Sequence, residues 1–382
     1  MRSYTVTRVW GIPIRINISL VVFLPVLAWL IGSGAQIAAY TAIVNGLGPV
    51  TLDPARLQVG TTPWVVGAVA ALGLFVSVVL HELGHAWAAM RYGLGVQSIT
   101  LWILGGIASL DAMPREWNRE LWIALAGPAV SLLVALACLG ALQVLPASLP
   151  AVVFVVGWLA VTNLVLTAFN LLPAFPMDGG RVFRALLARS RSYEDATRTA
   201  ARVGTGFAVL FALVGVLSFA PLLLLLALFV YGAATTESRT VLLQELLAGL
   251  TVGDVAGRDV QTVDADTSVA AFAERLLRDR RTAYPVVEDG ETVGAVTLAD
   301  VRDVPADERE MVTVGDIAQT DVPRLDRALG AFDGLVALNE QRGDVALLTA
   351  EDRVVGVVSS EDFSAVLQFR GDARSAGVRG AL

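Results

Sequence analysis

The sequence predicts a polytopic α-helical membrane protein with about six spans and a small membrane-associated β element, followed by a soluble α/β region. Three observations predict this fold class. Of the 382 residues, 55% are hydrophobic and only 16% are charged, whereas about a quarter are charged in ordinary soluble proteins. Uncharged stretches long enough to cross a bilayer recur before residue 237. Beyond that point the chain becomes acidic and repeats itself.

The net charge of −7 is unevenly distributed along the chain. Residues 1–245 hold 14 Arg and 10 acidic residues, a net charge of +4, whereas residues 246–382 hold 14 Arg and 25 acidic residues, a net charge of −11. The two parts are therefore expected to lie in different solvents. Nucleic-acid binding normally requires a basic face, so the acidic part predicts no nucleic-acid partner.

The expected spans follow the stretches that lack Asp, Glu, Lys and Arg. These stretches are 16–52, 57–81, 92–110, 121–177 and 203–236. A spanning helix needs about 20 apolar residues, so we expect a span near 17–35 and one near 63–80 that continues into residues 81–90. The stretch 121–177 holds two spans that separate near Pro146–Pro150. The stretch 203–236 fits one long helix or two short helices hinged at Pro221.

Arginine placement predicts the orientation, because cytosolic loops are enriched in Arg. Arginines precede the first span and follow the second and fourth, whereas the remaining connections hold only Arg56. The N-terminus and the connections after spans two and four are therefore expected in the cytosol. Two helices in 203–236 would return the acidic region to the cytosol and one would export it. We adopt two, which gives six spans.

Two segments of the membrane part have the pattern of strands. Tyr4–Ile18 alternates around Gly11-Ile12-Pro13 in the manner of a hairpin. Ser98–Ile103 also reads as a strand, within an uncharged connection that contains four glycines. Backbone at membrane depth must find hydrogen-bond partners in protein or water, so a re-entrant β element is expected here rather than a helix.

His81-Glu82-Leu83-Gly84-His85 is an HExxH motif at the end of the second span. Positions i and i+4 lie on one face of a helix, so two imidazoles can bind one Zn²⁺ while Glu82 acts as a base towards water. A catalytic zinc site typically has a third protein ligand. The chain has no other His, so this ligand is a carboxylate or Cys138. Asp178 is favoured because it emerges on the same side, although an Asp there could instead cap the following helix.

These residues resemble the site-2 protease family of intramembrane zinc metalloproteases over residues 1–240. The HExxH motif, the segment from Asn170 to Gly180 and the Gly105-Gly106 strand occur in the expected order. The resemblance implies one Zn²⁺ held by His81, His85 and Asp178, with Glu82 as general base. It further implies that Asn170, Gly105 and Gly106 contact substrate. Asn17 and Ser131 depart from the family, since relatives often carry His and Asn there.

The chemistry of this family implies a substrate with a transmembrane segment. A helical substrate hides its carbonyl groups in its own hydrogen bonds, so it must become extended before cleavage. The strand near Ser98–Ile103 is expected to offer an edge with which such a segment could pair.

The acidic region contains an internal duplication. Thr251-Val252-Gly253-Asp254 recurs at 313–316, and Gly294-Ala295-Val296-Thr297 through Asp300 recurs at 356–362, both with an offset of 62 residues. Two matches at one offset indicate a duplicated unit. Each unit is expected to run strand, helix, strand, strand, helix.

This duplication resembles a tandem pair of CBS domains. Such pairs often bind adenine nucleotides, and the resemblance implies that Asp300 and Asp362 hold ribose hydroxyls while Thr297 and Ser359 contact phosphate. The alternative is a module that serves only for homodimerisation. The expected parts are the protease domain 1–240, a linker 241–250, CBS units 251–310 and 311–370, and a tail 371–382.

Together these features predict a multi-pass zinc endopeptidase in the cell (plasma) membrane of a prokaryote, acting in regulated intramembrane proteolysis. The N-terminus and the CBS pair are expected in the cytosol, and the CBS pair is expected to regulate the enzyme or make it a homodimer. The main alternative is a CBS-regulated membrane metal transporter. A transporter should carry polar residues across several spans, whereas here they concentrate at two motifs.

Overall fold

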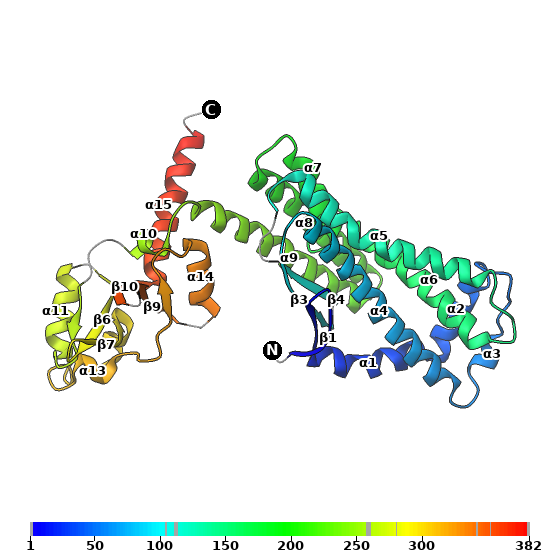
Figure 1. Ribbon diagram of the computed structural model, residues 1–382, viewed down its shortest axis with the longest axis horizontal. Coiled ribbons are helices and arrows are strands. Elements are labelled where there is room, and N and C mark those ends of the chain that lie inside the picture. Colours follow the sequence, from blue (N-terminus) through cyan, green and yellow to red (C-terminus); the bar gives the residue numbers. More distant parts are fainter. Residues whose placement is uncertain are drawn as a thin grey trace. The chain divides into compact units, whose positions relative to one another are not determined.

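The computed structural model describes residues 3–103, 105–110, 114–256, 261–279, 281–340, 343–351 and 353–379. The last three residues of the expected tail lie outside this part of the chain. The chain divides into two compact units, residues 1–238 and 239–382. Figure 1 labels most of the elements of both.

Membrane-spanning helices dominate the first unit. Within the described residues, five helices are long and apolar enough to cross a membrane: α4 (Thr62–Arg91), α5 (Trp117–Leu142), α6 (Pro150–Asn170), α8 (Tyr193–Leu217) and α9 (Pro221–Leu246). The break between α5 and α6 falls near Pro146, as expected. The stretch 203–236 holds parts of two helices that separate before Pro221, which confirms the two-helix interpretation.

The first expected span differs from the prediction. Residues 17–35 do not form one straight helix but contain α1 (Ile18–Ile31) and the start of α2 (Gly34–Val44), which are bent by 69°. At 1.5 Å per residue, the 14 residues of α1 reach only about 21 Å, whereas the hydrocarbon core is about 30 Å thick. Ser33 interrupts the helix with an extended backbone, so the two segments qualify as a span only as a bent pair.

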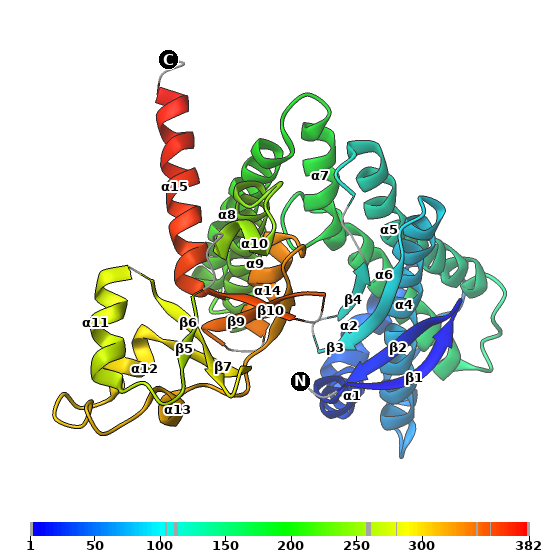
Figure 2. The ribbon, with the colours of Figure 1, turned by 60° about the vertical axis from the view of Figure 1, so that its left-hand side comes forward.

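A four-stranded sheet accompanies these helices, in the order β1-β2-β3-β4 (Figure 2). Its strands are β1 (Ser3–Val9), β2 (Ile12–Asn17), β3 (Val96–Trp102) and β4 (Gly105–Leu110). Both expected strand segments are confirmed. The expected free edge at Ser98–Ile103 is wrong, because β3 pairs in parallel with β2 and antiparallel with β4. Among the described residues, the strand at the edge on this side of the sheet is β4.

Helix α5 lies at the centre of the packing that positions the site. It packs against α4, α6 and the short helix α7 (Asp178–Ala188), and α7 packs in turn on α8. The short helix α3 (Pro54–Leu57) packs beside α2 at the opposite end of the bundle (Figure 1). There the core includes Leu57, Phe154 and Trp158. This arrangement brings α4 and α7, which carry the predicted ligands, together on α5.

The second unit contains the expected duplication. The first repeat comprises β5 (Val263–Asp264), α11 (Val269–Asp279), β6 (Ala283–Glu288), β7 (Glu291–Thr297) and α12 (Leu298–Asp303). The second comprises β8 (Arg324–Asp326), α14 (Ala331–Glu340), β9 (Val345–Ala350), β10 (Arg353–Ser359) and α15 (Ser360–Arg379). Each repeat forms its own three-stranded sheet. The predicted order of strands and helices is therefore present in both repeats.

The two repeats exchange their first short helices. Helix α10 (Val252–Ala256) precedes the first repeat, but the backbone N–H of Val252 donates to the carbonyl of Leu329 in the second repeat, over 2.8 Å. Helix α13 (Val314–Ile317) precedes the second repeat, and the N–H of Val314 donates to Thr267 of the first, again over 2.8 Å. Both valines are fully buried. Each repeat therefore completes the core of the other.

Candidate metal centre

Helix α4 places the two histidines of the HExxH motif side by side within the bundle. His81 and His85 are 5% and 6% exposed, and their Nε2 atoms lie 3.1 Å apart. Their rings meet edge to face, with centroids 4.8 Å apart. The helical spacing of four residues therefore brings two imidazole nitrogens to one point.

Asp178 supplies a third atom at that point. It is the first residue of α7, and its Oδ2 lies 3.1 Å from the Nε2 atoms of both His81 and His85. The cap position of α7 is occupied by Met177, which makes no side-chain cap hydrogen bond. The carboxylate of Asp178 therefore faces the two histidines, 97 and 93 residues away in the chain, rather than the end of its own helix.

The three side chains fit a single zinc ion. Zinc binds His nitrogen and carboxylate oxygen at about 2.0–2.2 Å in tetrahedral geometry, so two such ligand atoms lie about 3.4 Å from each other. The separations of 3.1 Å observed here are close to that value. Gly127 of α5 adjoins the cluster, and a Cβ atom there would lie 2.2 Å from Nε2 of His85. The space beside the three ligand atoms therefore depends on a glycine.

The outer nitrogens of both imidazoles are held by α5. Nδ1 of His85 donates to the carbonyl oxygen of Ile123 over 2.7 Å, and Nδ1 of His81 lies 2.9 Å from Oγ of Ser131. Partners of this kind fix the ring orientation and leave Nε2 free to bind metal. Ser131, one of the two positions at which the sequence departs from its relatives, therefore contacts the ring of His81. Asn17, the other departure, caps α1 through the N–H of Ser19.

Glu82 lies buried against the start of β4. A Cβ atom at Gly106 would lie 2.5 Å from Cγ of Glu82, so only glycine permits this approach. The preceding Gly105 has a φ of +136°, a value that other residues rarely adopt. The two glycines expected to contact substrate therefore adjoin the expected general base.

Asn170 is the last residue of α6 and is partly buried. Among the described residues it forms no hydrogen bond with His81, His85 or Asp178. Its expected contact with substrate stays a prediction.

The four residues expected to bind nucleotide form two helix caps in the second unit. Oδ2 of Asp300 accepts hydrogen bonds from the N–H and the hydroxyl of Thr297, both at 2.7 Å. Asp362 accepts equivalent bonds from Ser359 at 2.8 and 2.9 Å. Gln319 donates a further bond to Asp300 over 2.9 Å. In this structure the two pairs therefore serve the starts of α12 and α15.

Sequence reasoning missed a buried charged cluster around Arg184 of α7. This side chain is fully buried, and its guanidinium binds the carboxylates of Glu120 on α5 and Glu237 on α9. The rings of Phe175 and Tyr193 lie 5.0 and 4.8 Å from it. The sequence offered one signal, because Glu120 and Glu237 are the charged residues that border two long uncharged stretches.

Comparison with known families identifies both parts of the chain. The sequence profile of peptidase family M50 matches residues 69–150 and 147–213, which include the HExxH motif and Asp178. The profile of the CBS domain matches residues 252–307, which include α10 and the first repeat.

Individual relatives extend this match over most of the chain. A zinc metalloprotease from Methanocaldococcus jannaschii is 34% identical over 299 residues, covering 78% of this chain and 79% of the relative. A protein from Mycobacterium tuberculosis that is named as a zinc metalloprotease is 33% identical over 384 residues, covering 94% and 91%. The solved site-2 protease from Methanocaldococcus jannaschii is 34% identical, with a TM-score of 0.42, and covers 62% of this chain and 96% of that structure.

Membrane helices that enclose an HExxH motif and a distant aspartate define the class of integral-membrane metalloproteases. The chain belongs to peptidase family M50, the site-2 protease family. It is a zinc metalloprotease of the membrane that also carries a CBS domain. The alternative of a metal transporter is therefore set aside.

Proposed function

We propose that this metalloprotease cleaves transmembrane segments of other membrane proteins. The observation that carries the proposal is the burial of His81, Glu82 and His85 in α4, a helix long and apolar enough to span a membrane. Ionisable side chains inside a bilayer are costly and typically functional. A site at this depth serves a substrate that itself lies in the membrane.

In this proposal one Zn²⁺ per chain is held by Nε2 of His81, Nε2 of His85 and Oδ2 of Asp178. When bound, Zn²⁺ polarises a carbonyl group and makes water more acidic. Ser131 and the Ile123 carbonyl hold the two imidazoles in place during turnover. The equal spacing of the three atoms supports this ligand set.

Glu82 is the proposed general base. Its carboxylate takes a proton from the attacking water and later gives that proton to the leaving amine nitrogen. Gly106 packs directly against the Glu82 side chain and limits the conformations available to it. The carboxylate can therefore exchange a proton with little rearrangement of the side chain.

The open edge of β4 is the proposed docking element for the substrate. An unwound segment can add to a free strand edge through main-chain hydrogen bonds, and β4 begins at Gly105 and Gly106 beside Glu82. This pairing would bring an extended peptide to the base. Asn170 at the end of α6 is proposed to line the same space.

The function is tested with Glu82→Gln in cells. We expect this variant to keep its zinc, measured by elemental analysis of the purified protein, and to lose cleavage by at least about a hundredfold. New N-termini within transmembrane segments, identified by mass spectrometry of membrane fractions, should appear with the wild type and be absent with Glu82→Gln. Equal cleavage by both proteins would refute the role of Glu82.

The proposed ligand set is tested separately at Gly127. A methyl group there would approach Nε2 of both His81 and His85, so Gly127→Ala should reduce bound zinc at least about tenfold. Gly140→Ala is the matched control, because it lies in the same helix and its Cβ would meet nothing within 4 Å. Full zinc content in Gly127→Ala would show that the metal binds elsewhere.

We further propose that the duplicated unit is a regulatory or dimerising CBS pair that binds an adenine nucleotide at Thr297, Asp300, Ser359 and Asp362. The match of the CBS profile supports this assignment. Calorimetry of the full-length protein with ATP, ADP and AMP tests it, and Asp300→Ala with Asp362→Ala should weaken binding while zinc content stays unchanged. Absence of binding at millimolar nucleotide would leave dimerisation as the role of the pair.

The proposed arrangement is a protease domain 1–240, a linker 241–250, CBS units 251–310 and 311–370, and a tail 371–382. The N-terminus and the CBS pair would face the cytosol of a prokaryotic cell. Single cysteines at Ser190 and Thr320, in a Cys138→Ala background, test this topology. Labelling of either site by an impermeant reagent added to intact cells would overturn it.

A further inference from the structure

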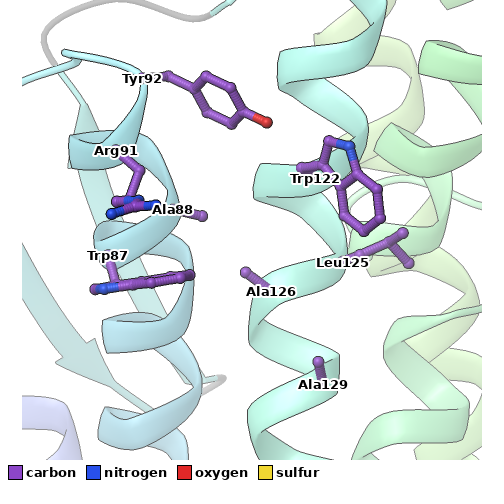
Figure 3. A pocket seen from close by; sticks show the side chains of 8 residues that line it. All are labelled: Trp87, Ala88, Arg91, Tyr92, Trp122, Leu125, Ala126 and Ala129. Carbon is purple, nitrogen blue, oxygen red and sulfur yellow. The ribbon is translucent and has the colours of Figure 1, made fainter.

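A groove between α4 and α5 lies apart from the residues proposed for catalysis. Its volume is about 460 Å³, within the range of about 300–1,000 Å³ that small-molecule sites occupy. Eight residues line it (Figure 3): Trp87, Ala88, Arg91, Tyr92, Trp122, Leu125, Ala126 and Ala129. The groove is therefore large enough for a ligand and belongs entirely to the first unit.

The groove lies where two consecutive spans meet one membrane surface. Helix α4 ends at Arg91, and the next span, α5, begins at Trp117. Trp87 and Trp122 on the two sides of the groove are 53% and 59% exposed. Tryptophan and tyrosine side chains of spanning helices gather at the level of the lipid headgroups. The groove is thus open to the lipid at the membrane–water interface.

The polarity of the lining changes along the groove. Figure 3 shows the hydroxyl of Tyr92 and the indole nitrogen of Trp122 near the end of α4. The side chains of Ala126 and Ala129 lie along α5 further from that end. One end therefore offers hydrogen-bond donors and the other a shallow apolar floor. A molecule with a polar head and an apolar tail matches this gradient.

Arg91 gives the polar end a positive charge. Its guanidinium lies over the Trp87 ring, 5.7 Å from the ring centroid (Figure 3). Among the residues that the structure describes, Arg91 forms no ion pair with an acidic side chain. The lining contains no Asp or Glu either. The charge at the polar end is therefore available to an anionic group.

We propose that this groove binds an anionic phospholipid of the surrounding membrane. The phosphate lies at Arg91, and an acyl chain lies along Ala126 and Ala129. A zwitterionic headgroup would bring its own cation towards Arg91. A headgroup with net negative charge does not, so the groove prefers the anionic lipid.

Native mass spectrometry of the full-length protein, titrated with lipids of identical acyl chains, tests the proposal. The wild type should bind phosphatidylglycerol more tightly than phosphatidylcholine. Arg91→Gln should weaken phosphatidylglycerol binding about fivefold or more, which is the expected contribution of one Arg near anionic lipid, and should abolish the preference. Ala129→Phe, which fills the apolar end at an exposed position, should weaken binding of both lipids.

Arg189→Gln is the matched control. Arg189 also lies over a tryptophan, 5.5 Å from the centroid of Trp117, but it does not line the groove. This variant should bind both lipids as the wild type does. Equal binding of the two lipids by the wild type, or an equal loss in Arg91→Gln and Arg189→Gln, would overturn the proposal. Unchanged binding in Ala129→Phe would do the same, because the lipid would then lie outside the groove.

Discussion

Aspartates in the first turn of a helix have opposite surroundings in the two units. Asp178 begins α7, and its Oδ2 lies 3.1 Å from two histidines that are more than 90 residues away in the chain. Asp362 lies in the first turn of α15, and its Oδ2 accepts two hydrogen bonds from Ser359, three residues before it. One carboxylate is bound by distant groups and the other by its own helix.

The difference arises from where the aspartate stands relative to the cap residue. Ser359 and Thr297 each provide a hydroxyl and an N–H that bind an aspartate three residues later, which is the reciprocal capping pattern. In α7 the cap position is Met177 and Asp178 follows it directly, so Asp178 stands two residues too early for this pattern, and the matching position, 180, holds a glycine. The carboxylate of Asp178 is therefore left for partners outside the helix. An aspartate at the start of a helix is therefore a better candidate for a metal ligand when no residue of its own helix cap donates a hydrogen bond to it.

The largest expected effect of this difference is on metal binding. Asp178→Asn should lower zinc affinity more than about a hundredfold, because changes even to groups behind the ligands cost about ten- to a hundredfold. Asp195→Asn is the control, since Asp195 is bound by Ser192 within its own helix at 2.8 Å. Competition with a zinc chelator measures both. Similar zinc retention by the two variants would contradict the comparison.

The next effect concerns stability at Arg184, which like Asp178 is held by distant residues. Removing one member of a buried ion pair leaves the other charge uncompensated and costs about 3–5 kcal/mol. Arg184→Met should therefore lower the thermal midpoint of the full-length protein strongly. Arg119→Met breaks a pair with Glu116 in which both side chains are exposed, and should cost about 1 kcal/mol or less. Equal shifts would mean that burial of Arg184 is unimportant.

A smaller effect is expected at the caps of the second unit. Asp300→Ala and Asp362→Ala should each destabilise this unit by about 1 kcal/mol, the usual consequence of losing a helix cap. Zinc content should not change. Asp300 also accepts a bond from Gln319, so its loss should be the larger of the two. Thermal unfolding followed by a probe in the second unit measures the difference, and a greater loss for Asp362→Ala would reverse this order.

The smallest effect is the pH dependence of Asp316. Hydrogen bonds from the backbone N–H and the hydroxyl of Thr313 lower the pKa of this exposed carboxyl. A lowered pKa in the folded state means that the contribution to stability is present above the unfolded pKa and is lost as pH falls through the folded value. Asp316→Asn should therefore be less stable than the wild type at pH 6, with the gap closing below about pH 4. A gap independent of pH would contradict this linkage.

The sequence predicts those parts of the fold and site that depend on residues close to one another in the chain. The HExxH spacing places His81 and His85 on one helical face, and uncharged stretches of fixed minimum length mark the spans. The position of Asp178 beside the histidines could be predicted because Pro173 and Pro176 end a span on the same side. The duplication was readable because both motifs recur at a single offset.

Features that depend on distant partners could not be predicted in the same way. Arg184 lies in an arginine-rich segment that resembles a cytosolic loop, and its partners are 64 and 53 residues away. The bend between α1 and α2 was missed because the whole stretch is apolar and composition alone does not reveal a helix break. Which strand lies at the edge cannot be predicted from the sequence, because pairing of β3 with β2 joins segments about 85 residues apart.

Because α10 packs on the second repeat and α13 on the first, this exchange determines which part of the second unit can fold independently. A chain that ended after the first repeat would leave Val252 without the residues of the second repeat that bury it, and the first sheet would lack Val314. The smallest transferable module is therefore the pair. A graft onto another protein, or an excision from this one, should succeed when it takes residues 247–370 together, with Leu247 of the second core, and fail when it divides them near residue 310.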